Sequence, residues 1–297
     1  MNTALITVVY QQDLYMFYLH ALSLDKNWQG PRNWRIIIED FDTTIPYVEA
    51  IVNELSDTWT ITIERPELGP DHFRPAHGDG WWRQQTLKLW AASHYPEDLF
   101  IVLDAKNILL KPVDLSYFYH YGSCAVTIRE SGTQDDMEPF WLSCKAKLGL
   151  EKYHIPRCSD LTPWVWPKYI VQSTLDRVHD LELDTETRWQ HKHRLLEFQL
   201  VWQHSWDKYE WHDWGEMVYF QVGPSSYQSD QQFHEHLVEG QRRFREHEKM
   251  VFWTQHRRDM HRAIMVKVLL AQVSDYGLSY DPTEFYRYFE LGQAQQK

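Results

Sequence analysis

Short apolar runs and amphipathic stretches alternate along the first 130 residues. The runs are too short for helices and carry β-branched residues, so they predict strands over residues 5–10, 34–38, 59–63, 99–103 and 123–129. The stretches between them have helical spacing and predict helices over residues 13–26, 46–55 and 81–93, the second with Pro46 at its start. This alternation favours an α/β fold with a mostly parallel central sheet flanked by helices.

The second half of the chain has a less regular pattern. Helices are predicted over residues 167–179, 187–205, 258–273 and 282–291, and strands over residues 217–222 and 250–254. Residues 135–210 read as a helical, Trp-rich insertion. Within it, residues 162–166 predict a loop whose Trp164 and Trp166 either stack on a sugar ring or pack in a core. No linker rich in Pro or Ser divides the chain, so we expect one domain over residues 1–297.

Composition narrows the function classes. The formal net charge is −12, which disfavours phosphate backbones and anionic membranes as partners unless the charge is segregated. Aromatic residues make up 15% of the chain, a share that suits stacking on carbohydrates or nucleobases as well as a large aromatic core. Three widely spaced cysteines, the lack of a signal peptide pattern and the lack of a long apolar run lead us to expect a cytoplasmic protein.

Candidate chemistry is concentrated in residues 78–115. A Gly-containing loop opens a helix that carries Arg83, Gln84 and Lys88, and the next strand ends at Asp104. Ligands of open α/β sheets bind at the carboxyl ends of the strands, where an Asp can bind a ribose hydroxyl or a divalent metal on a diphosphate. Lys106 lies two residues further on and would face the same way in an extended chain.

The order GWWRQQTLKL, apolar strand, LDAKN, ILLKPV resembles glycosyltransferases of the GT-A fold, in particular an uncharacterised capsule- or phage-type branch. The resemblance is best around this motif, extends to residues 1–130, and is weak through the insertion. It implies a nucleotide-sugar-binding half at 1–130, the insertion at 135–210, and an acceptor half with C-terminal helices at 211–297.

The resemblance includes one departure. In the family, an Asp-x-Asp motif binds a divalent cation and the diphosphate of the nucleotide sugar, but here the third position is Lys106. A protonated lysine cannot ligate a metal, although it can neutralise a diphosphate directly. Three interpretations stay open: Asp104 holds Mn²⁺ or Mg²⁺ with other ligands, Lys106 replaces the metal, or the protein is a pseudoenzyme.

The resemblance also implies roles for residues outside the motif. Glu216, with Asp213 in reserve, is the candidate general base on the acceptor hydroxyl. His256 would bind the metal or the diphosphate, with Arg257 or Arg258 on phosphate oxygens. The complete expectation is the catalytic residues Glu216 and Lys106, the metal ligands Asp104 and His256, and the substrate-binding residues Asp104, Tyr10, Asp40, Arg83, Gln84, Lys88, Asn107, His256 and Arg257.

These expectations point to transfer of a sugar from a nucleotide-diphospho-sugar, with a UDP-sugar favoured, to a hydroxyl of a glycan or glycoconjugate. The alternatives are a phage-type transferase acting on modified DNA bases, a nucleotide-sugar-binding protein without catalysis, and an assembly factor of a polysaccharide machine. Asp104→Ala is expected to remove activity and to leave thermal stability nearly unchanged.

Overall fold

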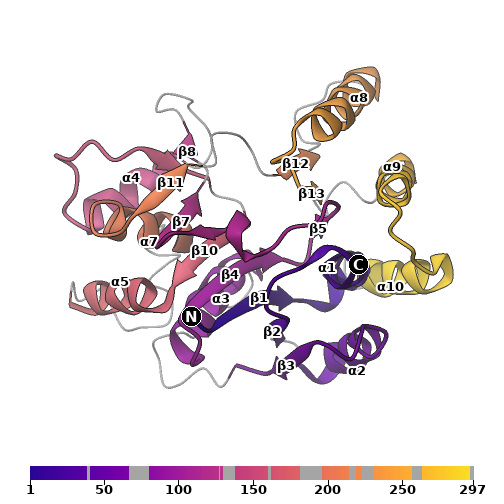
Figure 1. Cartoon of the computed structure of the whole chain (residues 1–297), viewed down its shortest axis with the longest axis horizontal. Coiled ribbons are helices and arrows are strands. Elements are labelled where there is room, and N and C mark those ends of the chain that lie inside the picture. Colours follow the sequence, from indigo (N-terminus) through magenta and orange to yellow (C-terminus); the bar gives the residue numbers. More distant parts are fainter. Residues whose placement is uncertain are drawn as a thin grey trace.

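The computed structural model describes residues 1–38, 41–66, 80–126, 128–129, 138–159, 162–180, 196–213, 219–222, 230–255 and 263–294. Their central sheet has five strands in the order β10-β4-β1-β2-β3. The strands are β1 (Thr3–Val9), β2 (Asn33–Ile38), β3 (Thr60–Glu64), β4 (Leu99–Asp104) and β10 (Trp164–Pro167). All neighbours are parallel except β10, which runs antiparallel to β4 (Figure 1). The predicted mostly parallel sheet is confirmed.

Successive side chains of the central strands point alternately into two hydrophobic cores, one on each face of the sheet. In β4, Leu99, Ile101 and Leu103 enter one core, while Phe100 and Val102 enter the other. Helix α1 (Leu14–Asn27) packs in the first core, and helices α3 (Gly80–His94) and α7 (Glu197–Ser205) contribute to the second. Both faces of the sheet are therefore covered at its centre, which explains why the fully buried strands β1 and β4 are predominantly apolar.

The remaining elements surround this sheet. They include η1 (Gln11–Asp13), α2 (Phe41–Val52), η2 (Leu115–Tyr117), α4 (Glu138–Lys147), α5 (Lys168–Asp180), α8 (Asp230–Glu246), α9 (Ala263–Asp275) and α10 (Pro282–Ala294). Three smaller sheets join β11 (Trp211–Asp213), β7 (Ser123–Val126) and β6 (Tyr119–His120), then β12 (Tyr219–Val222), β13 (Phe252–Gln255) and β5 (Asn107–Leu109), and finally β8 (Ile128–Arg129) with β9 (Arg157–Cys158). No helix in this described part of the chain combines the length and apolar composition needed to cross a bilayer.

Two local predictions are wrong. Helix α2 begins at Phe41 and contains Pro46 in its interior, so Pro46 does not mark its start. The predicted loop at residues 162–166 contains strand β10, in which Trp164 is 2% exposed and Trp166 is fully buried. These two tryptophans pack in the second core beside Phe198, so they cannot stack on an acceptor glycan.

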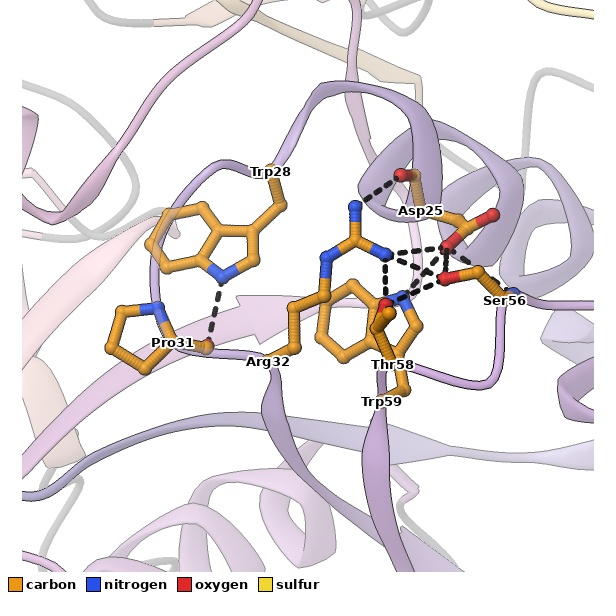
Figure 2. A network of polar contacts seen from close by, with 7 residues as sticks. All are labelled: Asp25, Trp28, Pro31, Arg32, Ser56, Thr58 and Trp59. Atoms are coloured by element: carbon orange, nitrogen blue, oxygen red, sulfur yellow. Dashed lines mark hydrogen bonds and ion pairs between the residues drawn. The ribbon is translucent and has the colours of Figure 1, made fainter.

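A polar network ties the loops at the amino ends of β2 and β3 to the end of α1 (Figure 2). Asp25 Oδ1 accepts from Arg32 Nη1 at 3.1 Å, from Ser56 Oγ at 2.8 Å and from Trp59 Nε1 at 2.8 Å. Arg32 Nη1 also donates to Thr58 Oγ1 at 2.7 Å. These contacts hold together the loops at the amino ends of the strands, whereas Asp104 lies at the carboxyl end of β4.

Candidate functional site

Asp104 ends strand β4 and lies on the same side as Phe100 and Val102, which is the face covered by α3. Its Oδ1 atom lies 2.7 Å from Lys88 Nζ and accepts from Gln84 Nε2 at 3.3 Å. Gln84 and Lys88 are four residues apart on α3, so both reach the same oxygen from one helix face. The Asp104 side chain is only 7% exposed.

Lys106 occupies the second oxygen of the same carboxylate. Its Nζ atom lies 3.3 Å from Asp104 Oδ2, and its side chain is 26% exposed. Asp104 is therefore held between two ammonium groups, of which Lys88 is sealed in the core and Lys106 reaches the surface. A partly exposed, oriented ammonium at the carboxyl end of a parallel strand can bind an anion.

The surrounding charges keep Asp104 ionised. Burial by itself would raise the pKa of its carboxyl, but Lys88 and Lys106 more than offset this and hold the pKa well below its usual range. The carboxylate is therefore a permanent negative charge that fixes both lysines.

Two residues at the start of α7 enclose Lys88 from the other side. Glu197 Oε1 lies 3.6 Å from Lys88 Nζ, and the Phe198 ring centroid lies 4.9 Å from the same atom. Burial raises the pKa of Glu197 to about 7, although Lys88 acts to lower it. Sequence reasoning missed Glu197. The available signal was an isolated acid in the apolar run LLEFQLVW, because a buried acid needs a buried partner.

Asn107 shapes the turn after Asp104. Its Oδ1 atom accepts from the Asp104 backbone N–H at 2.7 Å, and its Nδ2 atom donates to Thr254 Oγ1 at 2.9 Å. Its carbonyl oxygen contacts Nδ1 of the buried His20 at 2.5 Å. Asn107 is fully buried and Lys88 is 1% exposed. We expected both to touch a substrate, but their burial favours a role in positioning Asp104.

Among the residues that the structure describes, part of the predicted site comes together. Asp104, Lys106, Gln84, Lys88 and Asn107 are joined by the contacts above. Tyr10 is half-buried and directly follows β1, and the reserve base Asp213 is exposed at the end of β11. Asp40, Glu216, His256, Arg257 and Arg258 lie outside the described residues, as does the side chain of Arg83.

A family comparison accounts for most of the chain. Residues 19–266 match the model of a family of unknown function, DUF6492. The chain belongs to this family. No curated protein sequence matches it significantly.

Solved structures place the DUF6492 chain in a fold. The galactosyltransferase LgtC, in complex with donor and acceptor sugar analogs, matches with a TM-score of 0.52 at 11% identity, covering 96% of this chain and 99% of that one. Mouse xyloside xylosyltransferase 1 in its apo form also matches, with a TM-score of 0.46 at 12% identity, covering 85% and 96%. The likeness to LgtC shows the fold, so this DUF6492 member has the GT-A glycosyltransferase fold.

The described residues do not fit a divalent cation at Asp104. Both carboxylate oxygens already face ammonium groups, and a lysine stands where a second acid would be needed. Within the described part of the chain, no group of three or more His, Cys, Asp or Glu side chains is arranged to hold a metal. The predicted ligand His256 lies outside that part. A divalent cation bound by Asp104 would lie beside two ammonium groups, 2.7 Å and 3.3 Å from the two carboxylate oxygens, and would be repelled by both.

Proposed function

We propose that this protein is a glycosyltransferase that moves a sugar from a nucleotide-diphospho-sugar to an acceptor hydroxyl. Two observations support the proposal. The first is the GT-A fold, and the second is a partly exposed Lys106 ammonium that Asp104 holds at the carboxyl ends of the parallel strands. The second carries the argument, because it places a fixed positive charge where ligands of open α/β sheets bind.

In this proposal Lys106 takes the place of the metal. When the bond between the anomeric carbon and the diphosphate oxygen breaks, negative charge develops on the departing nucleoside diphosphate. A fixed ammonium beside those oxygens stabilises that charge without first having to reorganise. Asp104 keeps Lys106 in place through Oδ2, while Lys88 and Gln84 hold Asp104 through Oδ1. Of the three interpretations of the motif, the contacts therefore favour replacement of the metal.

The other roles remain part of the proposal. Tyr10 and Asp40 would bind the nucleotide, with His256 and Arg257 on the diphosphate. Glu216 would take the proton of the attacking acceptor hydroxyl, with Asp213 in reserve. A UDP-sugar donor and a glycan acceptor are the favoured substrates, and the galactosyltransferase crystallised with donor and acceptor sugar analogs has the same fold.

Calorimetric titration tests the proposal directly. UDP-, GDP-, CMP- and dTDP-sugars would be added to the protein in EDTA and, separately, in Mn²⁺. We expect one nucleotide class to bind in EDTA, and Lys106→Met to weaken binding about 10-fold and turnover about 100-fold, as loss of a fixed transition-state charge does. Lys152→Met removes a lysine that is exposed on a turn and serves as the matched control.

Three results would count against the proposal as stated. Failure of every nucleotide sugar to bind would reject the function. Binding that requires Mn²⁺ would reject the replacement of the metal by Lys106. Binding with no transfer or hydrolysis would favour the second candidate, a nucleotide-sugar-binding protein without catalysis, for which the acid-to-lysine change in the motif is the specific support.

A further inference from the structure

A lysine is buried beneath the candidate site. Lys88 is 1% exposed, and its Nζ atom lies between Asp104 Oδ1 at 2.7 Å and Glu197 Oε1 at 3.6 Å. The Phe198 ring closes a third side. A buried ammonium is costly unless charged partners surround it, so its position depends on both carboxyl groups.

We infer that Glu197 is a positioning residue of the candidate site, because it holds the Lys88 ammonium against Asp104 and thereby fixes the carboxylate that orients Lys106. The inference rests on the proposed function, since it assigns a role toward the same diphosphate. It adds a residue from α7, a helix that contributes to the second core with α3. Glu197 would act through Lys88 and Asp104 and would not itself contact the substrate.

Stability alone gives little reason for an acid at this position. Asp104 already gives Lys88 a counter-charge at 2.7 Å, and Glu197 adds a second, fully buried carboxyl at 3.6 Å. Its raised pKa reflects the cost of that burial. An apolar side chain of similar size would pack beside Phe198 without this cost, and Lys88 would keep Asp104 as its counter-charge at 2.7 Å.

Geometry explains what the second acid does. Lys88 carries three N–H donors on a flexible side chain, and Asp104 contacts the ammonium from one direction, that of β4. Glu197 places a carboxyl oxygen 3.6 Å from Lys88 Nζ in another direction, from α7, and so restricts the position of the ammonium. A fixed ammonium fixes Asp104 Oδ1, and the opposite oxygen then presents Lys106 in one orientation.

Two nearly isosteric variants test the inference. Glu197→Gln keeps an oxygen that can accept from Lys88, whereas Glu197→Met keeps the volume and removes the acceptor. We expect Glu197→Met to lower kcat about 10-fold with the KM for the acceptor unchanged, while its unfolding midpoint in urea stays at or above that of the wild type. Glu197→Gln should keep at least half of the wild-type kcat. Glu210→Gln, at an exposed position just after α7, is the matched control.

The possible failures can be told apart. If the wild-type protein neither binds nor turns over any nucleotide sugar, the proposed function falls and this inference falls with it. If the wild type is active and Glu197→Met is equally active, only the positioning role is overturned. It is also overturned if Glu197→Met loses kcat together with stability, or if Glu197→Gln is as impaired as Glu197→Met, since either result indicates a structural role.

Discussion

Two aspartates, at opposite ends of the same sheet, lie in networks with different charge balances. Asp25, near the amino ends of β2 and β3, pairs with one arginine and also accepts from a hydroxyl, an indole and a backbone N–H group (Figure 2). Asp104, at the carboxyl end of β4, faces two lysines. The Asp25 side chain is 27% exposed and that of Asp104 is 7% exposed.

The difference separates a structural network from one suited to binding. At Asp25 one positive charge, that of Arg32, pairs with one negative charge. The remaining contacts hold together the loops that precede β2 and β3. At Asp104 one carboxylate is shared by two ammonium groups, and the second acid of the cluster, Glu197, lies against the buried Lys88, so the more exposed Lys106 shares its counter-charge. An ammonium that shares its counter-charge and is held in one orientation can take an anion as a further partner.

The largest expected effect comes from removing the buried aspartate. Asp104→Ala should lower the free energy of unfolding by about 3 kcal/mol, because the buried Lys88 loses its nearest counter-charge. This revises the expectation from sequence that stability would hardly change. Urea unfolding measures the loss, and Asp104→Asn, which keeps an acceptor, is the milder comparison. A loss under about 0.5 kcal/mol, typical of a surface position, would contradict the burial argument.

A smaller effect concerns pH and separates Glu197 from the other buried groups. Its pKa is about 7 in the folded chain and near 4.5 when unfolded, so the folded state binds more protons between these values. Stability contributed by this group is therefore lost as pH rises from about 4.5 to 7. Glu197→Gln removes that loss, and its free energy of unfolding relative to wild type should rise by about 2 kcal/mol from pH 5 to pH 8.

Comparing Glu197→Gln with the wild type cancels the effect of the buried His20 on the pH dependence of stability. Burial lowers the pKa of His20 to about 4, although its contact with the Asn107 carbonyl opposes this. That shift makes wild-type stability fall as pH drops below about 6, in the opposite sense to Glu197. Because His20 is present in both proteins, their difference reports Glu197. A difference that stays flat across this range would show that Glu197 ionises normally.

The smallest expected effect concerns the structural network. Asp25→Ala should lower the free energy of unfolding by about 1 kcal/mol, because four donors lose a partly solvated acceptor. Turnover measured well below the unfolding temperature should stay at the wild-type level. A fall in turnover without a fall in stability would mean that the two ends of the sheet are coupled, and the contrast drawn above would fail.

Sequence reasoning found the elements of the sheet because their side-chain pattern is local. Strands β1, β2 and β4 contain short apolar runs and β3 has β-branched residues, and Asp104 stands out because it directly follows the apolar run of β4. The prediction of a loop at residues 162–166 failed because strand β10, Trp164–Pro167, is only four residues long, follows Pro163 and ends in a proline. So short a strand shows too little alternation to be distinguished from a loop.

The site residues that could be predicted from the sequence are likewise those whose relation to Asp104 is local. Lys106 was found because it is close to Asp104 in sequence, and Lys88 because it lies on the preceding helix. The burial of Lys88 and its pairing with Glu197 depend on how α7 packs against α3, which no spacing within either segment records. Lone charges within apolar runs, such as those in LKLWAA and LLEFQL, are the sequence feature from which both could be suspected.

Strand β10 has a consequence for protein engineering. It is contributed by residues 164–167 and yet pairs with β4, whose other neighbour is β1. A fragment ending near residue 130 would therefore leave the backbone of β4 unpaired along an apolar edge, which is a template for self-association. Chimaeras between relatives should exchange residues 1–130 together with the segment that supplies this strand.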